Sequence, residues 1–276
     1  MNHSSSVPER VSLSGHFVRW VDAEDPSSGV GAFRVVFAAI WLLYDLLDLA
    51  LGTTERSLDW YPHPRDPGLV VVQIVLVATG VMLISGRGVW AFGMTAAAAR
   101  GIEGFVYFPL NDFFLGSIFL LLLAHSTGGP FREDGPRRPR RTHRPHRPKW
   151  VRDALLAQLA FIYLATAVLK VNPDWLGGGH LFVRTQYMVV SWGWPYPAWL
   201  EQRLATPAFD ALLAKGAILA ELALAGILVA RRPWWLAAAL AIGIHAFGAF
   251  ITNVWFLSAT MIASVLLLVP REQARD

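Results

Sequence analysis

Three side chains that can exchange protons stand in consecutive apolar segments of this sequence. Lys170 ends one such segment, Glu221 lies within the next, and His245 lies within the one after that. A charge in the middle of a bilayer costs roughly 2.5–3.5 kcal/mol, so ionisable residues there usually have a role. We therefore predict a catalytic group made of Lys170, Glu221 and His245. The alternatives are a lysine that extends to the lipid headgroups and a histidine that only bridges two helices.

A second set of residues is predicted to bind a ligand or to support the first set: Arg100, Glu103, Asp112, Tyr163 and Trp175. Arg100 and Glu103 are three residues apart and can pair with each other on one helical face, where a structural ion pair is the alternative to a functional one. Tyr163 lies two turns before Lys170 on the same face. Asp112 opens an apolar segment, where it can equally serve as a helix N-cap.

Two further acids, Asp45 and Asp48, share a helical face near the end of the first apolar segment. The simplest interpretation is that both lie at the membrane interface in contact with water. Charged and polar groups of this kind are too numerous to be buried singly, because six buried charges would cost on the order of 15–20 kcal/mol. Most must be paired, hydrated or close to the interface.

No spacing matches a metal site, a phosphate-binding loop, a nucleophile elbow or a metalloprotease motif. Cysteine is absent, which excludes disulfides and thiolate chemistry. We predict no metal, and any chemistry must be assembled from residues on different helices.

The composition is that of an integral membrane protein. Hydrophobic residues make up 54% of the 276-residue chain and charged residues only 16%, against about 25% in soluble domains. A spanning helix needs roughly 20 apolar residues. We predict an all-α, polytopic membrane bundle of about eight transmembrane helices, at Val30–Leu51, Gly68–Ser85, Val89–Tyr107, Leu110–His125, Val151–Val171, Ala211–Ala230, Trp234–Ile251 and Val254–Val269.

Loop charges give the expected orientation. The loop at 126–150 is rich in arginine and proline, and cytoplasmic loops carry an excess of Lys and Arg. If this loop is cytoplasmic, the polar segment 1–29 and the tail 270–276 are cytoplasmic too. The membrane domain is then 30–269. The segment 172–210, which carries Trp175, Trp192, Trp194, Tyr196 and Trp199, is predicted to be an outer interfacial loop with a short helix at His180–Ser191. We expect a multi-pass protein of a prokaryotic plasma membrane, with membrane lipid as a partner and no nucleic acid.

This orientation gathers most polar positions of the apolar segments in the outer half of the membrane. Asp45, Arg100, Glu103 and Lys170 fall towards outer helix ends, Glu221 falls near mid-helix, and His245 falls in an outer half. We therefore expect an outward-facing polar cavity in which Lys170, Glu221, His245 and Arg100 converge.

An ordered set of residues resembles the HTTM domain, the membrane part of vitamin K-dependent gamma-carboxylase and its bacterial relatives. The set comprises Gln158, Tyr163, Lys170, Asp174-Trp175 with the glycines that follow, Glu221, the Arg231-Arg232 turn, His245 and Asn111-Asp112. The resemblance spans about Phe33–Val269. It implies that Lys170 is a base that deprotonates a reduced vitamin K-type quinone. An amine at the membrane interface suits this role when loss of water favours its neutral form.

Three functions are compatible with these features. The first is a quinone- or lipid-linked membrane enzyme with an outward-facing polar site. The second is a non-catalytic accessory or maturation subunit with a protein partner, since this sequence lacks the large extra-membrane domain of the carboxylase. A transporter is the third, although no inverted repeat or interrupted helix pair is evident.

Overall fold

The computed structural model describes residues 29–51, 67–107, 111–127, 149–192, 196–230, 233–252 and 255–269. Within these ranges the chain is helical and contains no strand, which confirms the all-α prediction. The segments 1–28 and 270–276 and most of the basic loop, 128–148, lie outside the described residues. The helices are α2 (Gly29–Leu51), α3 (Pro67–Ser85), α4 (Val89–Ile102), α5 (Asn111–Ala124), α6 (Lys149–Leu169), α7 (Pro173–Leu176), α8 (Gly179–Trp192), α9 (Ala198–Leu204), α10 (Pro207–Ala230), α11 (Trp234–Thr252) and α12 (Trp255–Leu268), with a π-helical turn at Glu103–Tyr107 and a 3₁₀ turn at His125–Thr127.

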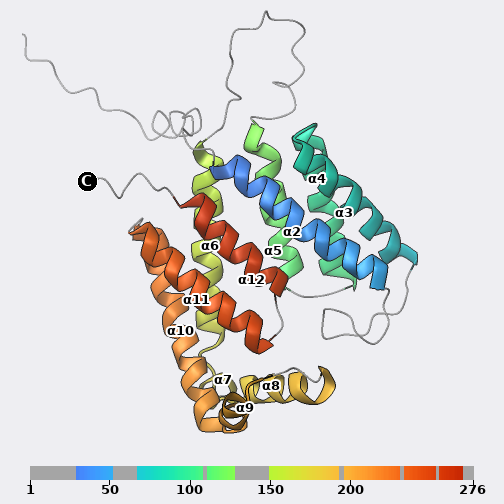
Figure 1. Ribbon diagram of the computed structural model, residues 1–276. Coiled ribbons are helices and arrows are strands. Elements are labelled where there is room, and N and C mark those ends of the chain that lie inside the picture. The colour runs from blue at the N-terminus through green and yellow to red at the C-terminus, as the bar shows by residue number, and fades with distance from the viewer. Residues whose placement is uncertain are drawn as a thin grey trace, which may run out of the picture.

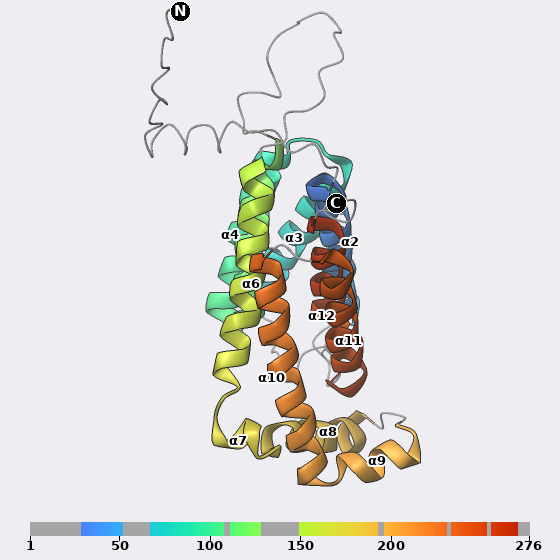
Figure 2. The ribbon, with the colours of Figure 1, turned by 90° about the vertical axis from the view of Figure 1, so that its left-hand side faces the viewer.

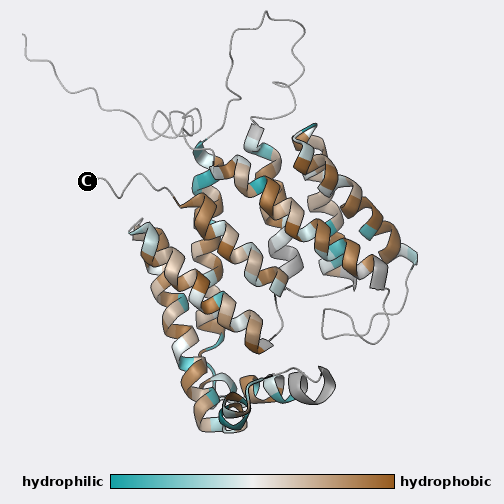
Figure 3. Cartoon of the chain, in the orientation of Figure 1, coloured by the Kyte–Doolittle hydropathy of each residue, from teal (hydrophilic) through white to brown (hydrophobic). Residues whose placement is uncertain are grey.

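Five of the helices are long and apolar enough to cross a membrane, judged by length and composition. They are α2, over Gly29–Leu47, together with α3, α6, α10 and α11. Each of the remaining predicted spans coincides with a 14-residue helix, namely α4, α5 or α12. Figure 3 shows apolar residues along most of the long helices. The coarse prediction of a helical, membrane-embedded chain is thus supported, and the count of eight crossings stays a prediction.

The long helices form two groups that α12 joins. On one side, α2, α3, α4 and α5 pack in sequence order, and on the other α10 packs against both α6 and α11. Between them, α12 contacts α2, α11 and α6 (Figure 1). The fold therefore places α4 in one group and α6, α10 and α11 in the other.

Aromatic residues form the contact between α2 and α12. Phe33, Phe37 and Trp41 are four residues apart and therefore share one face of α2, where each is at most 5% exposed. Phe256 of α12 meets this row, with its ring centroid 5.3 Å from that of Trp41 and 4.4 Å from that of Tyr44. Such ring pairs add about 0.5–1.5 kcal/mol each beyond the area they bury.

The helices α7, α8 and α9, which we call the arm, lie across the end of the bundle where α6 stops (Figure 2). The predicted short helix at His180–Ser191 is found there as α8. The Tyr196 hydroxyl donates a hydrogen bond to the Ile251 carbonyl of α11 at 2.5 Å, and both residues pack with Leu200 and Leu204. Burial, and then the negative charge of Asp210, raises the pKa of Tyr196 to about 12. The hydroxyl therefore stays protonated and keeps donating at physiological pH.

A glycine holds the arm against α10. Gly178 has φ +81°, a left-handed conformation that L side chains rarely adopt. A Cβ atom at this position would lie 2.5 Å from both the Ala211 nitrogen and the Pro207 oxygen. The backbone of the arm thus touches the backbone of α10, which only glycine permits.

Candidate functional site

The sequence Asn172-Pro173 ends α6 and starts α7. The residue before a proline is pushed away from helical geometry, and Asn172 has extended backbone angles, φ −142° and ψ 162°. Pro173 then occupies the first turn of α7, where its missing N–H leaves no bond unmade. Lys170 is therefore the residue directly after the last turn of α6.

The helices α6 and α10 are offset along their axes, so that the end of α6, with Lys170, lies beside the middle of α10. Glu221 lies about 21 Å from the Pro207 end of α10 and about 14 Å from its Ala230 end, at 1.5 Å per residue. The Lys170 ammonium nonetheless forms an ion pair with the Glu221 carboxylate, so α6 ends beside the centre of α10. The side chains are 20% and 8% exposed, respectively, so both charges are largely withdrawn from solvent.

A second pair, between Tyr163 of α6 and His245 of α11, joins α6 to the other helix that packs against α10. The Tyr163 hydroxyl is 2.8 Å from Nε2 of His245, a distance at which the two share a hydrogen bond. Only three residues separate the end of α10 from the start of α11, and Glu221 and His245 lie about 14 and 17 Å from these two helix ends. The two residues therefore occupy nearly the same depth in the bundle.

Trp175 of α7 covers the lysine. Its ring centroid is 5.3 Å from the Lys170 nitrogen, within the range of a cation–π interaction. The His180 ring stacks on the same indole with centroids 4.7 Å apart and planes 23° from parallel. The lysine thus lies between an acid on α10 and an aromatic ring on the arm.

One oxygen of the Glu221 carboxylate remains available to accept a hydrogen bond. One oxygen, Oε1, receives the Lys170 hydrogen bond, while Oε2 is buried and has no hydrogen-bond partner among the described residues. A buried acceptor without a donor costs about 1–3 kcal/mol. A ligand that carries a hydroxyl or N–H group would remove this cost by donating to Oε2. We call Lys170, Glu221, Tyr163, His245 and Trp175 the lysine cluster.

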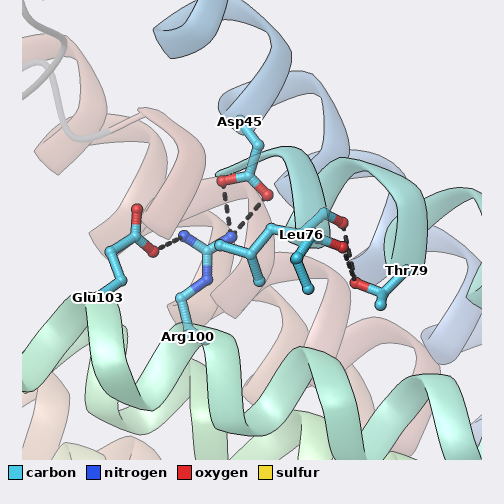
Figure 4. Close-up of polar contacts among 6 residues, drawn as sticks. Asp45, Leu76, Thr79, Arg100 and Glu103 are labelled. Carbon is cyan, nitrogen blue, oxygen red and sulfur yellow. Dashed lines mark hydrogen bonds and ion pairs between the residues drawn. The ribbon is translucent and has the colours of Figure 1, made fainter. Parts of the chain in front are cut away.

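Arg100 and Glu103 belong to a different group, which Figure 4 shows. The Arg100 guanidinium contacts both oxygens of Asp45 at 2.7 Å and also forms an ion pair with Glu103. All three side chains are at most 3% exposed, and the guanidinium lies 4.3 Å from the Trp41 ring centroid. A cavity of about 20 Å³ adjoins Asp45, Arg100, Trp41 and Thr79, enough for about one water molecule.

The structure therefore brings together part of the predicted site. Lys170, Glu221, His245, Tyr163 and Trp175 form one cluster, and Arg100 with Glu103 forms another on α4 and its π-helical turn. The expected pairing of Arg100 with Glu103 is confirmed. The interpretation of Asp45 as a solvated interfacial acid is wrong, because the residue is only 2% exposed and bound to Arg100.

Asp112 is the second residue of α5, and its side chain falls outside the described part of the structure. The same is true of the Asp48 side chain. Within the described ranges, no group of three or more His, Asp or Glu residues is arranged to hold a metal ion.

Sequence reasoning missed three residues of the arm and of the helix ends next to it. Asn172 links α6 to α7, His180 stacks on Trp175, and Asp210 is a fully buried acid in the first turns of α10. Only Asn172 had a readable signal, because asparagine before proline is typical of a helix start. No family model, curated protein or solved structure matches the chain. The residues and their geometry therefore carry the functional argument.

Proposed function

We propose that this protein is a multi-pass membrane enzyme of the HTTM type that acts on a quinone or another lipid-linked molecule with an uncharged, hydrogen-bond-donating head. In this proposal α2–α6 and α10–α12 provide eight crossings and both chain ends are cytoplasmic. The lysine cluster then opens towards the outer side, beneath the arm. The orientation rests on the loop charges.

The observation that supports this proposal most is the pairing of Lys170 with Glu221 inside an apolar bundle. Withdrawing both charges from water costs several kcal/mol each, which their attraction recovers only with good geometry. Such a pair contributes little net stability and is usually replaceable by apolar residues. Its presence beside an unpartnered Glu221 oxygen and the Tyr163–His245 pair favours a chemical role.

The charges of the cluster favour a neutral ligand head. The ammonium of Lys170 and the carboxylate of Glu221 cancel, so a ligand with a full negative or positive charge would leave an uncompensated charge in a medium of low dielectric. A hydroxyl that donates to Glu221 Oε2 adds no charge. A reduced vitamin K-type quinone, which the resemblance implies, has a head of this kind.

The chain's own groups then have distinct roles in a proton transfer. When the Lys170 ammonium passes a proton to Glu221, the pair becomes a neutral amine and a carboxylic acid without a change in net charge. The amine can then take a proton from the ligand hydroxyl as a general base. Tyr163 and His245 share a hydrogen bond that can accept or return a proton at the same depth.

The test is to identify what the protein retains when purified in bilayer discs cut directly from the host membrane. Extracted lipids and quinones from wild type would be compared by mass spectrometry with those from Lys170→Met and Glu221→Gln. Lys215→Met is the matched control, because Lys215 is an exposed lysine on the same helix as Glu221. We expect one hydroxyl-bearing molecule to be enriched with wild type and Lys215→Met and lost from the other two.

Equal lipid profiles for all four proteins would refute the proposed binding role. A charged phospholipid as the only enriched molecule would refute the inference that the head is neutral.

A further inference from the structure

We propose that Asn172 is a positioning residue, which sets the Lys170 amine in place by joining the end of α6 to the start of α7. This inference rests on the proposed function of the lysine cluster and adds a residue to it. The hydrogen bonds of Asn172 go to Leu169, Lys170, Trp175 and Leu176, so we infer that it acts through the backbone around Lys170 and Trp175.

The Asn172 side chain makes one bond to each helix. Its Nδ2 donates to the Leu169 carbonyl at 2.8 Å, and its Oδ1 accepts from the Trp175 backbone N–H at 3.0 Å. The backbone of Asn172 adds two more bonds, because its N–H donates to the Lys170 carbonyl at 2.9 Å and its carbonyl accepts from Leu176. The side-chain amide, the backbone N–H and the backbone carbonyl of Asn172 thus all form hydrogen bonds, and every partner lies between Leu169 and Leu176.

These bonds fix two of the groups that surround the lysine amine. Lys170 follows the last residue of α6, Leu169, and lies two residues before Asn172. Trp175 lies in α7, three residues after Asn172. The distance of 5.3 Å between the Lys170 nitrogen and the Trp175 ring therefore depends on this joint. Glu221, on α10, supplies the third constraint independently.

The chain contains a second joint of similar form that does not touch the lysine cluster. Thr206 precedes Pro207 as Asn172 precedes Pro173, and its hydroxyl donates to the Arg203 carbonyl at 2.6 Å, three residues back. The carbonyl of Thr206 accepts from Phe209 and Asp210 at the start of α10. Replacing Thr206 by alanine therefore removes a side-chain bond to the end of α9 at a joint before proline, keeps the backbone bonds to α10, and provides a control at a second joint.

The number of lysines makes the test direct. The sequence has only Lys149, Lys170 and Lys215, so reductive methylation with formaldehyde and a mild hydride donor can be followed at each by peptide mass spectrometry. The protein would be held in bilayer discs, and the rate at Lys170 would be expressed relative to the rate at Lys149, the first residue of α6. No ligand is needed for this measurement.

We expect Asn172→Ala to raise the relative rate at Lys170 about fivefold, the ratio that corresponds to losing one helix-cap bond. Asn172→Ser keeps an oxygen near the Trp175 N–H and should return the rate to within about twofold of wild type. Thr206→Ala should leave it unchanged. All variants would be compared at equal folded fraction, and Asn172→Ser serves as the second probe where the alanine variant folds poorly.

The proposal is overturned if Asn172→Ala leaves the rate at Lys170 unchanged, or if Thr206→Ala raises it as much, since the effect would then be general loosening. It is also overturned if serine fails to restore the wild-type rate. Because the assay uses no ligand, its failure is distinguishable from failure of the lipid comparison. A protein without a bound lipid can still show the Asn172 effect.

Discussion

Replacing Arg100 by methionine would remove the only cation that the described structure shows bound to Asp45. The guanidinium contacts Asp45 and Glu103 together, and its own side chain is only 2% exposed. Methionine is close to the aliphatic part of arginine in length and fills much of the same space. The change therefore tests charge rather than packing.

The expected loss of stability is large. Removing one partner of a buried ion pair costs about 3–5 kcal/mol, because the remaining charge stays buried without compensation. Here one cation serves two carboxylates, so we expect the upper part of this range. Net folding stability is only about 5–15 kcal/mol, so Arg100→Met should bring the protein close to unfolding.

The measurement is the free energy of unfolding from a denaturing-detergent titration in mixed micelles, followed by helical circular dichroism. Arg87→Met, at an exposed turn, is the control and should change stability by no more than about 0.5 kcal/mol. The triple change Asp45→Leu, Arg100→Met and Glu103→Leu removes these three charges together and should recover most of the loss. The electrostatic account fails if Arg100→Met costs less than about 1 kcal/mol, or if the triple variant is as unstable as the single one.

Two further predictions concern packing and the arm. Gly93→Ala places a Cβ 2.7 Å from the Ala124 Cβ and should lower the free energy of unfolding by about 1–3 kcal/mol in the same titration. The control, Gly243→Ala, meets nothing within 4 Å and should be neutral or stabilising. Equal effects of the two would contradict the close packing of α4 on α5. Tyr196→Phe removes the bond to Ile251 and should cost about 0.5–1.5 kcal/mol near neutral pH. Because the pKa of Tyr196 is raised from 10 to about 12, wild-type stability from this group is complete below pH 10 and falls as pH rises towards 12, a component that Tyr196→Phe should lack. Identical pH curves for the two proteins would refute this.

Local spacing was sufficient to predict some of these contacts. Arg100 and Glu103 are three residues apart on one helix, and such pairs meet whatever the rest of the fold does. The apolar segments likewise predicted the helices, because their length and composition are local properties. Hydrophobic periodicity within a segment does not, however, specify which helices become neighbours.

Contacts between distant segments were therefore only partly predictable. Asp45 is 55 residues from Arg100, and nothing in its own surroundings distinguishes a buried acid from an interfacial one. The grouping of Lys170 with Glu221 and His245 followed from depth, since loop charges placed all three in one part of the membrane. Depth does not fix lateral position, which is why the expected meeting of Arg100 with Lys170 was not found and Arg100 lies on α4, in the other helix group.

The length of α6 sets the position of the Lys170 amine relative to Glu221. Each residue inserted before Lys170 in α6 would carry its side chain about 1.5 Å along the axis and 100° around it, away from Glu221. Four inserted residues would nearly restore the angle but move the amine about 6 Å towards the arm. The helix length is thus itself a functional parameter of the site, and insertions in α6 should disturb the lysine cluster even when every side chain of the cluster is retained.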